Sequence, residues 1–272
     1  MSEHITTEEL SGIIQLIRAQ YGYDFSGYST ASLKRRIIRF CSLANVSVYD
    51  LKYHITNDES FFSWLLQSLT VNVTEMFRDP LFYKQLREDV LPVLGTYPTI
   101  KIWHAGCSSG EEAFSMAILL HEAGLLERAK IYGTDMNVSN IAKANSGIIP
   151  MLHMKEYTHN YRRSGGSADF SNYYTARYDN AIISKELRAN ILFSQHNLVT
   201  DYVFNEFQLI CCRNVLIYFN KELQNHVLNL FYKSLIPLGY LALGTKESLL
   251  FTDCSDKFDE ISLKNKIFRL KE

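Results

Sequence analysis

The chain has 272 residues, of which 47% are hydrophobic, so it can form one large domain or two small ones with a sizeable core. Its 28 Lys and Arg residues nearly balance its 29 Asp and Glu residues. This balance excludes a strong overall attraction to nucleic acid or to an anionic membrane, so recognition by charge must be local. The five cysteines form no C-x-x-C pair, which predicts reduced thiols and a cytoplasmic protein.

The sequence also argues against secretion and membrane insertion. Residues 1–4 do not form a basic flank before an apolar block, as a signal peptide would. No stretch approaches the roughly 18 uninterrupted apolar residues of a membrane span. We therefore expect a soluble protein.

The first part of the chain, up to about Leu94, predicts helices. Apolar residues recur at helical spacing in residues 10–17, and hardly any run resembles a strand. Thr7 is the expected cap of the first helix, and Ser29 or Thr30 of a second. The positive charges on this second helix are Lys34, Arg35, Arg36 and Arg39.

Beyond Tyr97 short apolar runs alternate with helical segments, which is typical of βαβ units that feed a parallel sheet. The expected strands are Ile100–Ala105, Lys130–Gly133, Ile191–Ser194, Phe207–Cys212 and Tyr240–Gly244. The expected helices are 112–123, 138–144 and 221–235. Residues 257–270 alternate like a hairpin, which predicts antiparallel strands at one edge of the sheet.

This organisation predicts three parts. Residues 1–80 form a helical N-terminal domain, residues 81–98 a linker with a helix, and residues 99–272 the sheet domain. Between about 147 and 188 the alternation stops and Tyr, Ser and Gly become frequent. We expect a small antiparallel β subdomain there, inserted into the sheet domain.

A glycine turn follows the first expected strand, at residues 106–110. Gly106 and Gly110 allow a left-handed backbone and a close approach of a ligand, and the following helix presents unpaired N–H groups. The spacing matches neither G-x-G-x-x-G nor a Walker loop, so tightly held phosphates are not indicated. Glu111 and Glu112 at the helix start favour a cationic ligand. By itself, the turn is equally compatible with a tight connection that binds nothing.

Polar side chains follow the other expected strands. Asp135 ends the second strand, where related folds bind ribose hydroxyls. A helix cap is the alternative role for Asp135, but Asn137 is the better cap. The residues after the third and fourth strands are Asn197, Leu198, Arg213 and Asn214. The first two suit an adenine edge and face, although Asn197 also suits a plain turn, and the last two lie where open α/β sheets bind ligands.

Together, these stretches resemble the CheR-type chemotaxis receptor (protein-glutamate) methyltransferases. The stretches are 72–79 (NVTEMFRD), 105–112 (AGCSSGEE), 134–135 (TD), 196–198 (HNL) and 212–219 (CRNVLIYF). The resemblance extends over nearly the whole chain and ends with 244–248 (GTKES), where members usually carry Gly-His-Ser-Glu. Ser109 stands where members usually carry Thr, and Ala113-Phe114 where Pro-Tyr is usual.

The resemblance implies an α/β protein with a class I methyltransferase (Rossmann-like) sheet domain, an inserted antiparallel β subdomain and an all-α N-terminal domain. It implies S-adenosyl-L-methionine as cofactor, S-adenosyl-L-homocysteine as product, and no metal. The implied cofactor-binding residues are Asn72, Thr74, Arg78, Ala105, Gly106, Glu112, Asp135, Met136, Asn197, Leu198, Arg213 and Asn214. Arg78 and Tyr218 are implied to lie near the transferred methyl and are the candidate catalytic residues.

The implied reaction is the methylation of glutamates on methyl-accepting chemotaxis receptors. A glutamate with a pKa of ~4.3 is ionised at neutral pH and needs no general base, so the enzyme's task is alignment. For docking of an acidic receptor helix, the candidates are Lys34, Arg35, Arg36 and Arg39. A solvated charged face is the alternative role for these four, and whether the β subdomain binds a receptor peptide stays open.

Two other functions remain open. One is a carboxyl methyltransferase that acts on a signalling protein outside chemotaxis, and the other is a receptor adaptor that binds the cofactor without catalysis. Neutral net charge argues against a nucleic-acid substrate. We expect a cytoplasmic monomer whose partner is the helical cytoplasmic region of a receptor.

Overall fold

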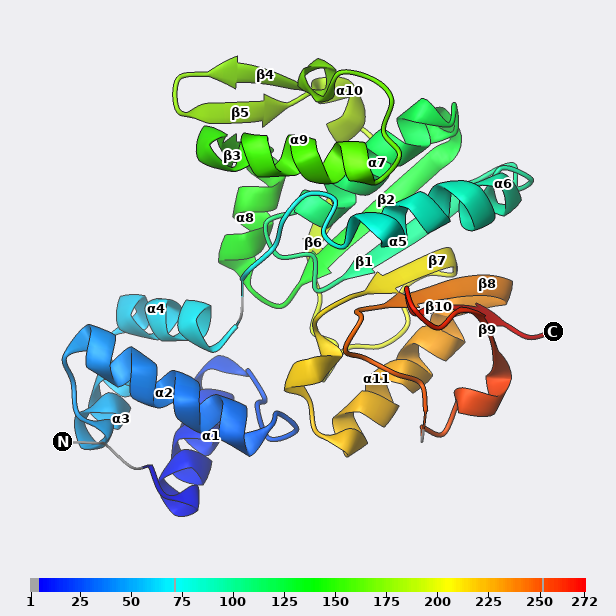
Figure 1. Ribbon diagram of the computed structural model, residues 1–272. Coiled ribbons are helices and arrows are strands. Elements are labelled where there is room, and N and C mark those ends of the chain that lie inside the picture. Colours follow the sequence, from blue (N-terminus) through cyan, green and yellow to red (C-terminus); the bar gives the residue numbers. More distant parts are fainter. Residues whose placement is uncertain (1–4, 71, 251) are drawn as a thin grey trace.

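The computed structural model describes residues 5–70, 72–250 and 252–272. A bundle of four helices comes first. Its members are α1 (Thr7–Tyr21), α2 (Thr30–Ala44), α3 (Val48–Asn57) and α4 (Glu59–Leu69). Figure 1 shows this bundle in blue beside the sheet, joined to it by the segment that follows α4. The all-α N-terminal part expected from the sequence is confirmed.

The helix caps differ from the prediction in one place. Thr6, not Thr7, caps α1, because its hydroxyl accepts a hydrogen bond from the Glu9 N–H while the Glu9 carboxylate accepts one from the Thr6 N–H. Ser29 occupies the cap position of α2 as predicted, but its side chain makes no capping hydrogen bond. The sequence signal that favours Thr6 over Thr7 is Glu9, because an acid three residues after the cap completes a capping box.

A seven-stranded sheet forms the centre of the second part, in the order β6-β2-β1-β7-β8-β10-β9. The strands are β1 (Ile100–Ala105), β2 (Ala129–Asp135), β6 (Ile191–Gln195), β7 (Phe207–Cys212), β8 (Leu235–Leu243), β9 (Phe258–Ser262) and β10 (Ile267–Leu270). The first five run parallel, and β10 pairs antiparallel with β8 and β9. The predicted strands and the antiparallel edge hairpin are therefore confirmed, except that β8 begins at Leu235 rather than at Tyr240.

Both faces of the sheet are buried, which explains why its central strands are mainly apolar and do not alternate between apolar and polar residues. Leu209 and Cys211 of β7 face one hydrophobic core, and Ile210 and Cys212 face the other. The first core includes α5 (Pro80–Gln85), α6 (Leu91–Leu94), α7 (Glu111–Glu122) and α8 (Val138–Ser146). The second core joins α11 (Lys221–Ser234) to the N-terminal helices, so the bundle and the sheet share apolar contacts.

Shorter elements complete the fold. Residues Leu86–Val90 form a π-helical turn (η1) between α5 and α6. The 3-10 turns are η2 (Leu126–Arg128), η3 (Met151–His153), η4 (Phe170–Tyr173), η5 (Leu216–Tyr218) and η6 (Ser255–Lys257). No helix in the described ranges is long and apolar enough to cross a membrane.

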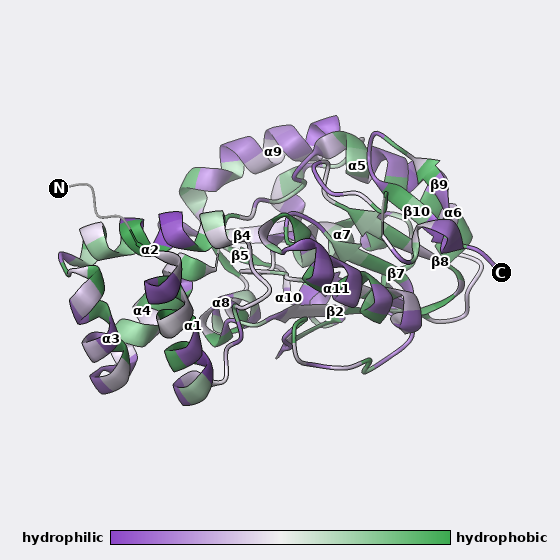
Figure 2. Ribbon diagram, turned by 90° about the horizontal axis from the view of Figure 1, so that it is seen from below, coloured by the Kyte–Doolittle hydropathy of each residue, from purple (hydrophilic) through white to green (hydrophobic). Residues whose placement is uncertain are grey.

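The inserted segment forms the small β subdomain that the sequence predicts. Its three antiparallel strands have the order β3-β5-β4 and are β3 (Ile148–Pro150), β4 (Tyr174–Arg177) and β5 (Asn180–Ile183). Two helices belong to the same segment, α9 (Met154–Arg163) and α10 (Lys185–Arg188). In Figure 2 α9 runs along the top of the molecule and is mainly hydrophilic.

The parallel pairing determines where the polar side chains meet. Ala105 of β1 pairs with Thr134 of β2, and Asp135 pairs with Gln195 of β6. The carboxyl ends of these strands therefore lie at one edge of the sheet, next to the segment that leads from the helical bundle. Ligands bind at this edge in open α/β sheets.

Candidate functional site

A cavity of about 960 Å³, open to solvent, lies at this edge. The predicted site residues that line it are Asn72, Thr74, Arg78, Gly106, Glu112, Asp135, Met136, Asn197, Leu198, Arg213, Asn214 and Tyr218. Ala105 is buried at the end of β1 and is not among the lining residues. The structure thus brings together residues that are spread over nearly 150 positions of the sequence.

The glycine turn is shaped by two close approaches. Gly106 has a φ of 76°, and a Cβ there would lie 2.5 Å from Cγ2 of Val215. Gly110 has a φ of 95°, and a Cβ there would lie 2.9 Å from the Phe193 ring. Only glycine satisfies both the left-handed backbone and the lack of space. The turn therefore packs directly against the loop that follows β7, and both border the cavity.

Asp135 ties the glycine turn to the end of β2. One carboxylate oxygen accepts the Ser108 N–H at 2.9 Å, and the other accepts the Asn137 N–H at 2.9 Å. Asn137 caps α8, as predicted, by accepting the Ser139 N–H. Burial raises the pKa of Asp135 despite these hydrogen bonds. The carboxylate is thus held in place at the cavity wall.

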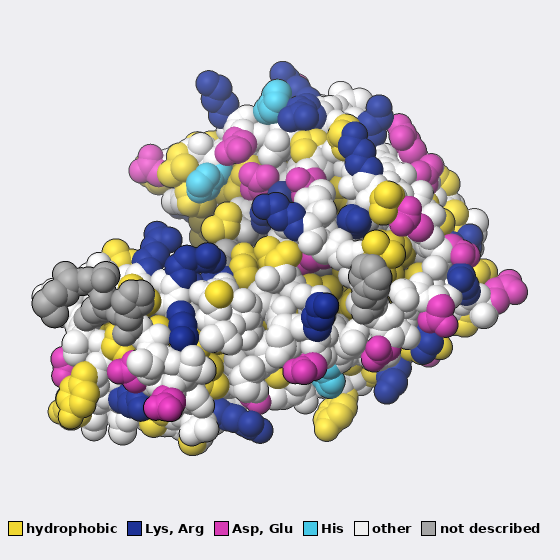
Figure 3. Space-filling model, turned by 60° about the horizontal axis from the view of Figure 1, so that its bottom comes forward, with side chains coloured by type: hydrophobic (Ala, Val, Ile, Leu, Met, Phe, Trp, Pro, Cys, Tyr) yellow, Lys and Arg dark blue, Asp and Glu magenta, His cyan; other side chains and the backbone are white. Residues whose placement is uncertain are grey.

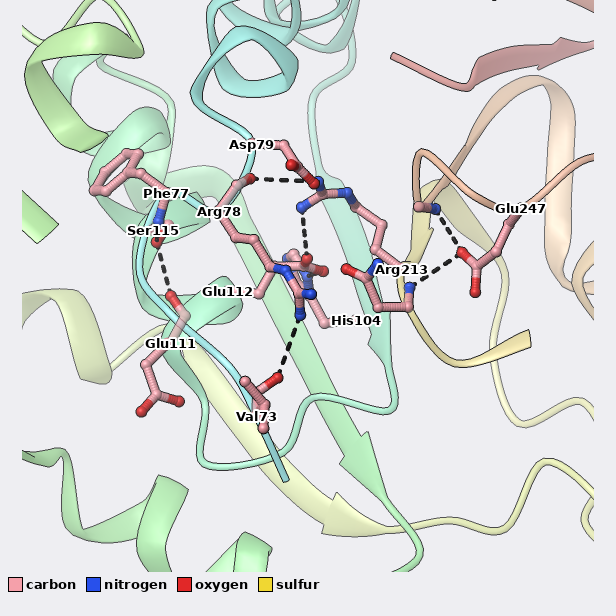
Figure 4. Close-up of polar contacts among 12 residues, drawn as sticks. Val73, Phe77, Arg78, Asp79, His104, Glu111, Glu112, Ser115, Arg213 and Glu247 are labelled. Atoms are coloured by element: carbon pink, nitrogen blue, oxygen red, sulfur yellow. Dashed lines mark hydrogen bonds and ion pairs between the residues drawn. The ribbon is translucent and has the colours of Figure 1, made fainter. Parts of the chain in front are cut away.

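Glu112, in the first turn of α7, is the centre of a charged network (Figure 4). One of its oxygens accepts a hydrogen bond from His104 Nδ1 at 2.8 Å, and the other accepts one from Arg213 Nη1 at 3.0 Å. The Arg213 side chain is 1% exposed and also pairs with Asp79 at 2.7 Å. Burial alone raises the pKa of Glu112, but these partners outweigh it and lower the pKa below its usual value.

His104, Glu112 and Cys211 bring three metal-ligand atom types within 4.8 Å of one another. Both Glu112 oxygens already accept hydrogen bonds, and one of the donors is the cationic Arg213. Burial also raises the pKa of the Cys211 thiol, which disfavours the thiolate that a metal requires. We therefore interpret this cluster as part of the ion-pair network.

The segment between the helical bundle and α5 is held at several points. The Phe77 N–H donates to Ser115 Oγ at 2.9 Å, and Arg213 donates to the Arg78 carbonyl oxygen. Phe77 and Asp79 have φ values of 54° and 57°, a conformation that costs free energy in residues other than glycine. The ring of Phe77 is fully buried. These contacts fix the backbone on both sides of Arg78.

The Arg78 side chain itself lines the cavity and makes one hydrogen bond, to the Val73 carbonyl oxygen at 3.3 Å. The network of Glu112, Arg213 and Asp79 and the guanidinium of Arg78 therefore border the same cavity. Arg78 forms no ion pair among the described residues. This arrangement can hold a ligand with cationic groups and also receive a carboxylate.

Asn197 has two observed roles. Its side-chain oxygen accepts the Val199 N–H at 3.0 Å, as in an Asx turn, and the residue also lines the cavity. The turn role that the sequence left open is thus present, and it does not exclude a ligand contact. Leu198 and Met136 provide apolar surface in the same wall.

Glu247 supports the site, although our sequence interpretation gave it no role. This buried carboxylate accepts the N–H groups of Gly244 at 2.5 Å, Asn214 at 3.1 Å, Val215 at 2.8 Å and Ile217 at 3.3 Å. It therefore shapes the loop that carries Asn214 and Tyr218. The signal in the sequence was the acid that follows Gly244 by three residues, since Gly244 and Glu247 are the two positions of that stretch that keep the family pattern.

The helical bundle also contributes to the cavity. The Tyr28 hydroxyl donates to Met136 Sδ at 3.3 Å, and Tyr28 forms a backbone bridge with Phe219. The Arg36 guanidinium lies over the Tyr218 ring at 4.3 Å and donates to the Leu69 carbonyl oxygen. Tyr28 was absent from our predicted site, because a loop tyrosine carries no sequence signal for such a contact.

Of the four predicted docking cations, Arg36 therefore points inward. Arg35 and Arg39 are exposed, and Lys34 is half-buried and donates to the Thr7 hydroxyl. Figure 3 shows Lys and Arg side chains gathered on the helical part, beside a hollow that separates it from the β subdomain. Of these four cations, only Arg36 lines the cavity.

Two family models match the two parts of the chain. The family described as "CheR methyltransferase, SAM binding domain" matches residues 72–267, and the one described as "CheR methyltransferase, all-alpha domain" matches residues 8–70. We propose the division 1–80, 81–98 and 99–272. Its connecting part, residues 81–98, includes α5 except its first residue, Pro80, and all of α6. Residues 1–4 of that division lie outside the described ranges.

Individual relatives span almost the full length. "Putative methyltransferase Cher3" of Pseudomonas putida is 49% identical over 98% of both chains. "Chemotaxis protein methyltransferase" of Listeria innocua is 30% identical over 87% of this chain and 88% of its own. The N-methyltransferase NodS of Bradyrhizobium japonicum, solved with S-adenosyl-L-homocysteine, is 14% identical over 82% of this chain and 98% of its own, with a TM-score of 0.41.

The family matches cover the helical bundle and the sheet domain in the order that the structure shows them. The cavity that joins the two parts is where the predicted cofactor residues meet. The chain therefore belongs to the CheR family of S-adenosylmethionine-dependent methyltransferases.

Proposed function

We propose that this protein is a protein-glutamate O-methyltransferase that forms methyl esters on methyl-accepting chemotaxis receptors. The observation that carries the proposal is the position of Arg78. Its guanidinium forms no ion pair with a described carboxylate, although it interacts electrostatically with Glu75 in the same wall, and it borders the same cavity as Glu112 and Asp135. A carboxylate that enters the cavity would thus meet a cation beside the cofactor.

The cavity residues fit S-adenosylmethionine. We assign Glu112 to the ammonium of its methionine part and Asp135 to its ribose hydroxyls. Asn197, Leu198 and Met136 surround the adenine, and Gly106 leaves the space that a closely approaching ligand needs. The acids of this wall suit a cofactor with ammonium and sulfonium charges.

Bound S-adenosylmethionine supplies the methyl group: a carboxylate oxygen of the acceptor forms the new O–C bond while the C–S bond breaks and its electrons pass to sulfur. Because a glutamate with a pKa of ~4.3 is ionised at neutral pH, no residue has to remove a proton. Arg78 orients the incoming carboxylate, and Tyr218 borders the reacting groups. Alignment of this kind contributes roughly 7 to 11 kcal/mol in favourable cases.

We further propose that the receptor docks through Arg35, Arg39 and Lys34 of α2, which lie on the helical part beside the cavity. Arg35 and Arg39 are four residues apart and share one face of the helix. An acidic receptor helix complements this face. We also propose that the protein acts in the cytoplasm, because the receptor regions that such enzymes modify are cytoplasmic. We propose that it acts as a monomer.

The test is methyl transfer to the proteins of the same cell. Membranes incubated with the protein and methyl-labelled S-adenosylmethionine should gain base-labile label on a receptor band, since carboxyl methyl esters hydrolyse in base. Arg78→Ala should lose this transfer by about a hundredfold and still bind the cofactor. Base-stable label would instead indicate another acceptor group, and cofactor binding without any transfer would indicate the adaptor function.

A further inference from the structure

His104 is a buried histidine in the site for which the proposed reaction has no use. It lies on β1, its side chain is 1% exposed, and its Nδ1 is 2.8 Å from Glu112 Oε1. Its other ring nitrogen, Nε2, is buried and has no hydrogen-bond partner in the described residues. Figure 4 shows the ring directed at the Glu112 carboxylate from the strand below it.

This geometry determines where the histidine carries its proton. A carboxylate can only accept, so Nδ1 carries the hydrogen and donates it to Glu112. Nε2 has no partner among the described residues, so the bond to Glu112 is the hydrogen bond that orients the ring.

The contacts of Glu112 hold its carboxylate in one orientation. Both of its oxygens accept hydrogen bonds, one from His104 and one from Arg213, so the carboxylate has little freedom to rotate. Glu112 also lines the cavity. An ammonium group on the cavity side of Glu112 would therefore meet a carboxylate that is already oriented.

We propose that His104 is a positioning residue that orients Glu112 toward the ammonium of the cofactor's methionine part. The proposal rests on the cofactor role assigned to Glu112 above. His104 touches no reacting atom, and it acts by donating one hydrogen bond that holds the carboxylate toward the cavity. Loss of this bond leaves Glu112 attached to Arg213 alone and weakens its contact with the ammonium.

Three substitutions separate positioning from packing. In His104→Asn the amide nitrogen stands near the position of Nδ1 and keeps the donor. In His104→Gln the donor reaches toward the position of Nε2 instead, and His104→Leu has no donor. Binding of S-adenosylhomocysteine, which has the ammonium, is compared by calorimetry with binding of methylthioadenosine, which lacks the amino-acid part.

His104→Leu and His104→Gln should bind S-adenosylhomocysteine about tenfold more weakly and methylthioadenosine as wild type does. His104→Asn should restore the affinity for S-adenosylhomocysteine. Thermal unfolding of each variant shows whether it is folded. Equal losses for both ligands, no loss for either, or failure of His104→Asn to restore affinity would overturn the role of His104. A wild-type protein that binds neither ligand would instead refute the cofactor assignment.

Discussion

The guanidinium of Arg36 lies 4.3 Å from the centre of the Tyr218 ring, although the two residues belong to the helical bundle and to the sheet domain. The Ser29 N–H donates to the Tyr218 carbonyl oxygen at 2.8 Å, next to the start of α2. Tyr218 is therefore held from the N-terminal side through both its ring and its backbone. The helical bundle therefore helps to form the wall of the cavity.

Arg36→Ala should lower kcat by about tenfold, because Tyr218 loses a cation–π partner and the cavity loses a positive charge. The dissociation constant of S-adenosylhomocysteine should change little, since Arg36 contacts no residue assigned to the cofactor. Steady-state methyl transfer at saturating receptor measures the first quantity and calorimetry the second. Arg35→Ala, the neighbouring and outward-facing cation, is the matched control for kcat. Equal kcat values for the two variants would contradict the inward role of Arg36.

Charge reversal at both Arg35 and Arg39 should raise the KM for the receptor and leave kcat and cofactor affinity nearly unchanged. These side chains are exposed and have no ion-pair partner among the residues described, so their contribution is a screened attraction to an acidic helix. The effect should shrink as salt is added. Reversal at Arg18, an exposed cation of α1 that already pairs with Asp24, serves as the control. An unchanged KM would remove the docking role of α2.

Glu247→Ala should destabilise the protein by about 2 kcal/mol or more, because four backbone N–H groups lose their shared acceptor. Denaturant unfolding measures this change. Activity should fall as well, since the loop from Asn214 to Tyr218 loses its anchor. Lys246→Ala, an exposed neighbour, should alter neither quantity. A Glu247→Ala protein as stable and active as wild type would show that the loop is held by other contacts.

Cofactor affinity should weaken toward acid pH because of Asp135. Burial raises the pKa of this carboxylate above its ordinary ~3.9, so Asp135 takes up a proton before Glu112, whose pKa is lowered.

The same raised pKa affects the stability of the fold, because it means that the folded protein binds this proton more tightly than the unfolded chain does. The protonated form therefore favours folding at low pH, and this contribution is lost as the pH rises through the raised value.

Calorimetric titrations with S-adenosylhomocysteine at several pH values test this assignment. Wild type should bind more weakly as Asp135 becomes protonated, because a neutral carboxyl accepts the ribose hydroxyls less well. Asp135→Asn should bind weakly at every pH, with a flatter profile. Parallel profiles for the two proteins would assign the pH dependence to another group.

The sequence predicted those parts of the fold that depend on local patterns. β1 and β7 have the predicted limits because each is a mainly apolar run that ends at a polar or glycine residue. The start of β8 was missed, since Pro237 and Gly239 interrupt its pattern and Leu238 has a φ of 62°. Thr6 was missed as a cap because Thr7 beside it offers the same side chain.

The site was predictable where a residue follows a strand of the parallel sheet, as Asp135 and Arg213 do. Parallel strand pairing brings the carboxyl ends of the strands to one edge of the sheet, so the position of such residues does not depend on contacts elsewhere in the chain. Arg36, Tyr28 and His104 act through contacts with residues far away in the sequence. No local pattern specifies which side of α2 faces the cavity, or that a histidine on β1 meets an acid of α7.

Mass spectrometry of a methylated receptor tests the central claim most directly. The cytoplasmic region of a receptor from the same cell is incubated with the protein and S-adenosylmethionine, digested, and searched for peptides that gain the mass of one methyl ester. The account predicts this gain on glutamate side chains with wild type, and its loss with Arg78→Ala. Methylation on lysine, on another nitrogen or on no residue, with a protein that binds the cofactor, would contradict it.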